Sequence, residues 1–212
     1  MTMQPRKPRS PRRLAPLTLS ALLLAAQLSG CGGGNPLGNP PDVSNPAGAG
    51  GQKLAFAYFQ YCIQPLLVTP ITSPQGGSNT CASGGCHSNI NGTGGALRIT
   101  DPAASVNLSD PANTPAVIRT TDMYKNYYSS LGVTIPGDAL QSRLLDKPLL
   151  LNVLHGGGQI LASEQDTAAR LITYWINHPA PQGQDEFGTA TYSMFTPALD
   201  PANPGASTCN LP

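Results

Sequence analysis

Two cysteines and a histidine lie within the seven residues 81–87, in a chain of 212 residues that has five cysteines and three histidines. Cys86 directly precedes His87, as in the C-x-x-C-H pattern through which haem is attached covalently. Each thiol can add across one vinyl group of a porphyrin, and the adjacent imidazole can bind the iron from one face. Four residues separate Cys81 from Cys86 instead of two, but most are glycine or serine, which can bulge outward. The motif predicts one covalent haem c with His87 as proximal ligand.

The N-terminal segment has the features of an export signal. Residues 1–13 contain basic residues and no acid, and residues 14–28 are mainly apolar, which is too short for a comfortable transmembrane helix. The segment ends in Leu-Ser-Gly before Cys31, as in a bacterial lipobox. We therefore predict a lipoprotein signal over residues 1–30 and a lipid on Cys31. The alternative is an ordinary signal peptide that leaves Cys31 as a free thiol.

A tether and an acidic domain are expected to follow the signal. Residues 31–52 are mostly Gly, Pro, Asn, Ala and Ser, which is typical of a flexible spacer. Gly32, rather than Asp, follows Cys31, which favours an outer-membrane lipoprotein facing the periplasm or the cell surface. Beyond residue 30 the chain has 7 basic and 11 acidic residues, a formal charge of −4. This charge argues against nucleic acid as a partner and is compatible with redox partner proteins in the cell envelope.

The remaining sequence predicts a mainly α domain with long loops. Apolar periodicity and helix-capping signals predict four helices, over residues 53–68, 115–131, 138–147 and about 164–177. Pro65 is expected to kink or end the first helix, and Pro148 to stop the third. Trp175 is expected in the core, facing a cofactor pocket or the first helix. Residues 183–212 are polar and Pro-rich, which predicts an irregular tail.

Several motifs together resemble a family of electron carriers. The matching pieces are Cys86-His87, Gly94–Leu97, Ser142–Pro148, His155–Gly158 and Leu171–Ile176. Residues 53–182 thereby resemble a cytochrome c domain, more narrowly the planctomycete-type modules of exported bacterial proteins. The resemblance implies a small cytochrome c-like helical domain, with the haem between helices and a second axial ligand from a later loop.

Four side chains remain after the signal as candidates for the second ligand. His155 is favoured because three glycines follow it, which lets the backbone approach a porphyrin closely. Met123, Met194 and an open sixth position remain as alternatives. His178 ends the last predicted helix, where histidine commonly interacts with the helix dipole, and is interpreted as structural.

Cys62 and Cys209 are left over. In an exported protein two remaining cysteines most simply form a disulfide, with free thiols or intermolecular bridges as alternatives. The resemblance supports this pairing, because the terminal helices of cytochrome c folds pack together.

The leading functional hypothesis is electron transfer by a membrane-anchored haem c lipoprotein. The sequence contains no grouping of serine, histidine and acid and no paired carboxylates, so we do not expect an enzyme. One alternative is a haem-based binder or sensor of small ligands with an open sixth site. Another is a haem-free lipoprotein in which Cys81 and Cys86 form a disulfide. Zinc binding by Cys81, Cys86 and His87 has the right atom types but fits an exported Cys-His motif less well.

Overall fold

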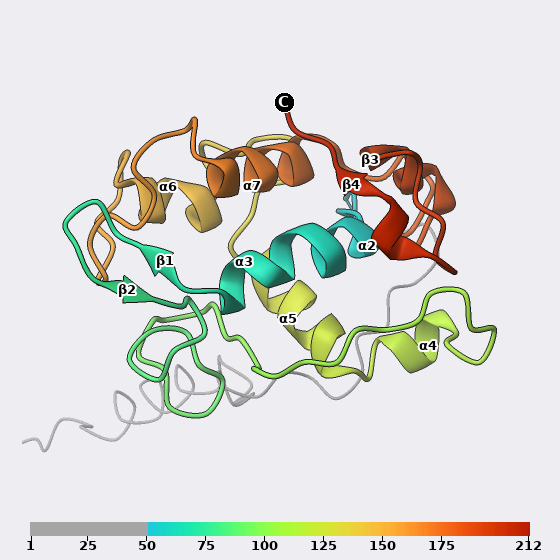
Figure 1. Cartoon of the computed structure of the whole chain (residues 1–212), viewed down its shortest axis with the longest axis horizontal. Coiled ribbons are helices and arrows are strands. Elements are labelled where there is room, and N and C mark those ends of the chain that lie inside the picture. Colours follow the sequence, from blue (N-terminus) through green and yellow to red (C-terminus); the bar gives the residue numbers. More distant parts are fainter. Residues whose placement is uncertain (1–50) are drawn as a thin grey trace, which may run out of the picture. The chain divides into compact units, whose positions relative to one another are not determined.

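The computed structural model describes residues 51–212, and this part of the chain is mainly helical with long loops, as predicted (Figure 1). It contains six α-helices, three shorter helical segments of other types and two small antiparallel sheets. The predicted signal, the lipobox Cys31 and nearly all of the tether lie outside the described residues. None of the helices in residues 51–212 has the length and apolar character needed to span a membrane.

The first helix runs without a break from Phe56 to Val68. It consists of α2 (Phe56–Tyr58), the π-helical segment η2 (Phe59–Ile63) and α3 (Gln64–Val68). Pro65 lies in the first turn of α3 and does not end the helix. Proline has no N–H to donate to the preceding turn, and the helix has a wider π turn directly before it.

The predicted helix over residues 115–131 is two helices, α4 (Pro115–Ile118) and α5 (Asp122–Leu131). The hydroxyl of Thr121 accepts a hydrogen bond from the N–H of Tyr124 at 3.2 Å. Thr121 is therefore the N-cap of α5, and such side-chain caps favour a new helix start.

Helix α6 (Arg143–Leu149) begins five residues later than predicted and continues through Pro148, so the prediction was wrong at both ends. Residues 138–142 form turns instead. The hydroxyl of Ser142 accepts from the N–H of Ile135 and donates to the carbonyl of Asp138, both at 2.7 Å, which holds this turn.

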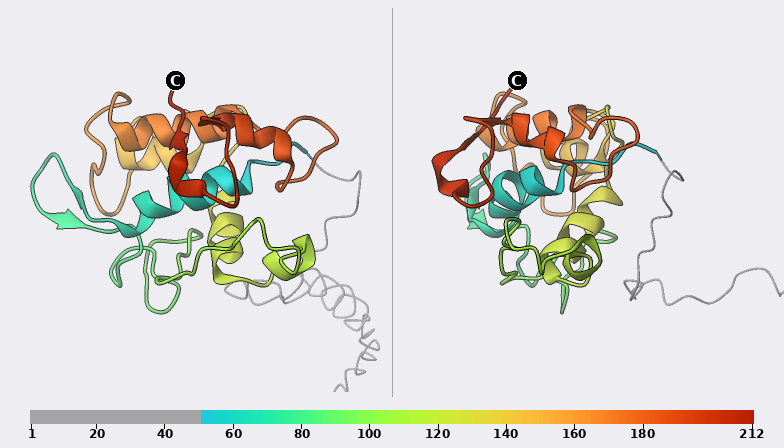
Figure 2. Two further views of the ribbon diagram at one scale, coloured as in Figure 1. Left: turned by 45° about the vertical axis from the view of Figure 1, so that its right-hand side comes forward. Right: turned by 90° about the vertical axis from the view of Figure 1, so that its right-hand side faces the viewer.

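Helix α7 (Thr167–Asn177) packs against the first helix through an aromatic core. The ring centroid of Phe59 lies 5.4 Å from that of Trp175 and 5.6 Å from that of Tyr127. The indole N–H of Trp175 donates to the carbonyl of Ala55 at 3.0 Å. Trp175 is fully buried and faces the first helix, which was one of its two predicted positions. The first helix lies between α6 and α7 on one side and α5 on the other (Figures 1 and 2).

The C-terminal segment is ordered, and the prediction of an irregular tail over residues 183–212 was wrong. It contains the 3-10 helix η3 (Thr189–Met194), strand β3 (Phe195–Thr196), the short helix η4 (Pro204–Ala206) and strand β4 (Thr208–Cys209). Strands β3 and β4 pair antiparallel.

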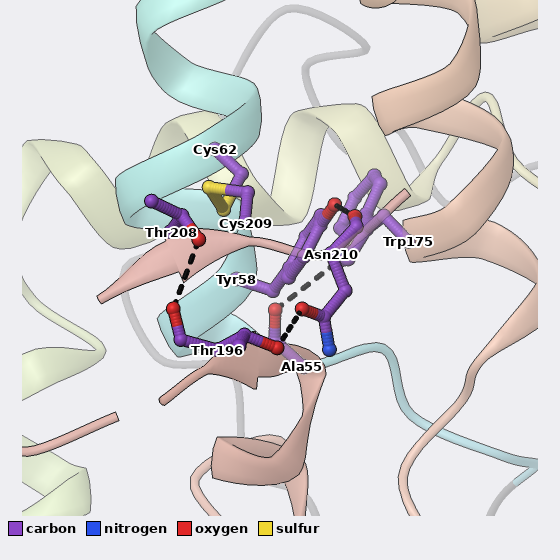
Figure 3. Close-up of a disulfide and its surroundings, with 8 residues drawn as sticks. All are labelled: Ala55, Tyr58, Cys62, Trp175, Thr196, Thr208, Cys209 and Asn210. Atoms are coloured by element: carbon purple, nitrogen blue, oxygen red, sulfur yellow. Dashed lines mark hydrogen bonds between the residues drawn. A yellow bond between two sulfur atoms is a disulfide. The ribbon is translucent and has the colours of Figure 1, made fainter. Parts of the chain in front are cut away.

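This segment is fastened to the first helix (Figure 3). Cys62 and Cys209 form the disulfide expected from the sequence, with their Cα atoms 6.1 Å apart. The hydroxyl of Tyr58 donates to the carbonyl of Asn210 at 2.6 Å. The folded domain therefore continues beyond residue 182 to β4.

The sheet formed by β1 (Ile71–Thr72) and β2 (Ser78–Asn79) leads into the segment of Cys81, Cys86 and His87. These two strands pair antiparallel directly after the first helix. The N–H of Ala82 then donates to the carbonyl of Leu67 at 3.0 Å. The hairpin thus returns the chain to the end of α3, where the motif begins.

Candidate functional site

The segment that carries Cys81, Cys86 and His87 is a series of turns held by backbone hydrogen bonds. The N–H of His87 donates to the carbonyl of Cys81 at 2.9 Å, so the spacer between the cysteines is looped back. The carbonyl of His87 accepts from the N–H of Ile99 at 2.7 Å, and Ser88 forms an isolated parallel bridge with Ile99. The four-residue spacer therefore forms a closed loop, and both the N–H and the carbonyl of His87 bond to other parts of the chain.

The two thiols of the motif are half-buried and not bonded to each other. Burial raises the pKa of Cys81 to about 11, with a smaller contribution from the nearby Cys86. Because the thiolate is the nucleophilic form, we expect Cys81 to react slowly with alkylating reagents in the folded, haem-free chain.

The imidazole of His87 is half-buried and oriented by one backbone carbonyl. Its Nδ1 lies 3.1 Å from the carbonyl oxygen of Leu97. Since a carbonyl only accepts, Nδ1 carries the proton and Nε2 has a free lone pair. Burial lowers the pKa of His87, and the Leu97 carbonyl opposes this only in part. Burial therefore favours a neutral imidazole, and the hydrogen bond to Leu97 selects the tautomer in which Nε2 can bind a metal.

His155 lies in a loop that leaves α6 and closes on itself. Its Nδ1 lies 2.8 Å from the carbonyl oxygen of Gly158, and the N–H of Gly158 donates to the carbonyl of His155 at 2.9 Å. Gly158 has a φ of +73°, a conformation that favours glycine. Of the three glycines after His155, this one is required by the backbone of the turn. His155 is thereby held in the same tautomer as His87, with Nε2 free.

The loops bring these two imidazoles together, although 68 positions separate them in the chain. Their ring centroids are 6.2 Å apart and their planes differ by 8°. A bond from histidine nitrogen to a metal is about 2 Å long. The centroid of an imidazole ring with bonds of about 1.35 Å lies about 1.15 Å from each ring atom. The metal and the ring centroid are therefore about 3.15 Å apart. Two imidazoles bound on opposite sides of one metal ion therefore have centroids about 6.3 Å apart.

The other candidate ligands have different surroundings. Met123 and Met194 are 2% and 5% exposed and pack in the hydrophobic core. His178 is exposed, its Nδ1 lies 2.8 Å from the carbonyl oxygen of Tyr174, and its ring stacks on the Tyr174 ring. Its contacts are thus local to the end of α7, as expected for a structural histidine.

Large apolar side chains near both histidines are exposed to solvent. Ile90 and Leu154 are 93% and 88% exposed, the highest values among the large hydrophobic residues of the described chain. Leu151 and Val153, in the loop of His155, are also exposed.

The described residues contain no group of three or more His, Cys, Asp or Glu side chains that could hold a metal ion. The feature of residues 51–212 that offers two nitrogen donors close together is the pair of imidazoles of His87 and His155. Sequence reasoning identified both histidines but not the groups that orient them, the carbonyls of Leu97 and Gly158. The glycine spacing near His155 was the only sequence signal for these contacts.

No protein-family model matches the chain, and the searches of curated proteins and of solved structures found no match either. The resemblance to cytochrome c domains therefore stays a prediction from sequence motifs.

Proposed function

We propose that this protein is an electron-transfer lipoprotein with one covalently bound haem c. Cys81 and Cys86 would hold the porphyrin, His87 would be the proximal ligand and His155 the distal ligand. The observation that carries this proposal is the pair of nearly parallel imidazoles with centroids 6.2 Å apart. That spacing agrees with the value of about 6.3 Å expected for two histidines on one metal ion.

The hydrogen bonds of both rings support the same assignment. Histidines that bind metals almost always donate their other ring N–H to a carbonyl, a carboxylate or water, which fixes the ring and its tautomer. His87 and His155 each have Nδ1 on a backbone carbonyl, at 3.1 and 2.8 Å. The site would therefore offer two ligands of matching tautomer, although it is built from two distant segments.

The exposed apolar residues also fit a flat hydrophobic cofactor. Leaving Ile90 and Leu154 in water is unfavourable by about 25 cal/mol for each Å² of apolar surface. A porphyrin close to either side chain would cover part of this surface. The cofactor would thus contribute to the stability of the loops that hold it.

Two histidine ligands favour electron transfer over reactions at the iron. Haem supplies reversible one-electron chemistry, while the protein sets ligand identity, burial and orientation. His87 and His155 would be the two nitrogen ligands of the iron, and replacing a methionine ligand by histidine lowers the reduction potential. The contribution of this chain is to hold both imidazoles nearly parallel, each with Nδ1 on a backbone carbonyl.

The predicted lipid on Cys31 and the tether over residues 31–52 would place the domain at a membrane surface, within reach of redox proteins of the cell envelope. Acyl chains give stable anchoring when two or more are present. Metabolic labelling with a fatty acid tests this part. We expect label in the wild-type chain and none in a Cys31→Ala variant, and equal labelling of both would rule out lipidation at this residue.

Haem binding is tested on protein produced with a cytochrome c maturation system. We expect a covalent haem stain, the mass of one haem and a six-coordinate low-spin spectrum. His155→Ala should change the spectrum to a high-spin form, whereas His178→Ala should leave it unchanged. A wild-type protein without covalent haem would contradict the whole proposal, and low-spin ligation that persists in His155→Ala would contradict the assignment of the distal ligand.

One observation favours a second function, the binding of a small ligand at the iron. In the described chain, the hydrogen bonds of residues 153–158 are all made among these residues. His155 thus belongs to a self-contained turn, which can move away more easily than His87. Rapid CO binding by the reduced wild-type protein would favour this function, and slow or absent binding would favour electron transfer.

A further inference from the structure

Gly94 lies directly against the imidazole of His87. A Cβ atom placed on Gly94 would be 2.5 Å from both Cε1 and Nδ1 of His87 and 2.7 Å from the carbonyl oxygen of Cys86. The N–H of Gly94 donates to that same carbonyl at 2.7 Å. Real Cβ atoms do not approach other atoms this closely, so no other residue fits here unless the ring or the backbone moves.

The backbone at Gly94 does not explain the glycine. Its φ lies outside the left-handed region, whereas the next residue, Gly95, has a φ of +77° and open space around it. The two neighbouring glycines therefore have different roles. Gly95 satisfies a backbone conformation, and Gly94 makes room for the side chain of His87.

We infer that Gly94 is a positioning residue for His87. The missing side chain lets the imidazole lie against the backbone of residue 94, where Nδ1 reaches the carbonyl of Leu97. This contact leaves Nε2 free, in a ring nearly parallel to that of His155. The inference rests on the proposed haem function for its effect on a metal, but the ring orientation itself exists in the haem-free chain.

Gly94→Ala tests the inference, with Gly85→Ala as the matched control. Gly85 lies in the same motif, a Cβ atom placed on it would meet nothing within 4 Å, and its φ lies outside the left-handed region. Long-range ¹H–¹⁵N NMR of the haem-free full chain reports which ring nitrogen of His87 carries the proton. We expect the Nδ1–H form in the wild type and in Gly85→Ala, and loss of this uniform signal in Gly94→Ala. An unchanged His87 signal in Gly94→Ala would overturn the inference.

Thermal unfolding gives a second measurement in case Gly94→Ala folds poorly. The substitution should lower the Tm more in the wild type than in a His87→Ala background, because removal of the ring relieves one of the two clashes. The carbonyl of Cys86 remains, so the relief should be partial. Equal losses of Tm in both backgrounds would show that the ring of His87 does not require Gly94.

The holoprotein separates this inference from the proposed function. If haem attaches, the ferric EPR spectrum of Gly94→Ala should differ from that of the wild type, and that of Gly85→Ala should not. If the wild type attaches no haem, the proposed function fails, while the NMR and Tm measurements still decide the role of Gly94.

Discussion

Removal of the disulfide between Cys62 and Cys209 should cause a large loss of stability. The bond joins the π-helical part of the first helix to β4, across 147 positions of the chain (Figure 3). The perturbation is the double variant Cys62→Ala/Cys209→Ala in the haem-free full chain. The hydrogen bonds around the bridge, such as that from Tyr58 to the carbonyl of Asn210, would remain.

The magnitude follows from the length of the closed loop. In the chain-entropy model, a loop of this length removes about 17 cal/mol/K from the unfolded state, or about 5 kcal/mol at 25 °C. Domains of this size are stable by only about 5–15 kcal/mol, so the bridge supplies a large share of the total. Because the effect acts on the unfolded state, the folded structure should change little.

Urea unfolding followed by tryptophan fluorescence measures this loss. Trp175 is the only tryptophan of the chain and is fully buried, so its emission reports the unfolding of the core. The double variant should lose up to about 5 kcal/mol and show a larger m-value, since its unfolded chain is less constrained. Cys81→Ala/Cys86→Ala is the control and should lose about 1 kcal/mol or less. A loss below about 1 kcal/mol in the first variant would refute the reasoning.

Three further predictions concern charged or reactive groups. Cys81 should react with iodoacetamide at pH 8 about 100-fold more slowly in the folded haem-free chain than in urea, because burial raises its pKa from 9.0 to about 11. Equal reaction rates in the folded and the urea-unfolded chain would contradict this prediction. Burial lowers the pKa of His87, so the unfolded state binds the proton more tightly than the folded state. The free energy of unfolding should therefore fall as the pH decreases from about 6.5 through the pKa of the folded state. Urea titrations at several pH values measure this dependence, which His87→Gln should weaken. Arg119→Met should lower the free energy of unfolding by about 3–5 kcal/mol, because it leaves the carboxylate of Glu186, which is 0% exposed, without its ion-pair partner at 2.9 Å. Adding Glu186→Gln should recover part of this loss. A loss below about 1 kcal/mol for Arg119→Met would show that the ion pair is not important for stability.

The helical regions were predictable because they depend on local patterns, but their boundaries were not. Apolar periodicity is a local property, and it indicated the first helix, α5 and α7. The break before α5 depends on whether Thr121 bonds to Tyr124 or to solvent, which the pattern does not decide. The start of α6 depends on a turn held by Ser142.

The C-terminal segment was misjudged because its order comes from distant partners. Residues 183–212 have no apolar period of their own, yet Glu186 is fully buried. Its side chain accepts hydrogen bonds from Arg119 at 2.9 Å and from Tyr124 at 2.8 Å, and its carbonyl accepts from the N–H of Phe56. A sequence shows that an acid is present but does not show which base and which hydroxyl will meet it.

In the candidate site, too, local sequence features were predictable and contacts between distant segments were not. The adjacency of Cys86 and His87 is a local signal that could be read directly. His155 was chosen from its glycine-rich flank, but its approach to His87 depends on how two long loops pack. The role of Gly94 depends on the position of one imidazole, which no composition or spacing indicates.

The two imidazoles are held by different kinds of structure, and this difference has a consequence for function. His87 is fixed by backbone hydrogen bonds to Cys81 and Ile99 and by the contact of its ring with Gly94. His155 is oriented by a turn that bonds only within itself, between two anchored ends of a loop. At the start of that loop, the N–H of Asn152 donates to the side chain of Asp146, and at its end the N–H groups of residues 160 and 161 donate to the carbonyl of Pro148.

This arrangement keeps the turn close to His87 while leaving it free to move as a unit. Local opening is easiest where a segment has few contacts with the rest of the domain. Any exchange of an axial ligand would therefore occur on the side of His155, and His87 would stay in place. In the proposed function, the choice between electron transfer and small-ligand binding would thus depend on the stability of one loop, and the motif of Cys81, Cys86 and His87 would serve both functions equally.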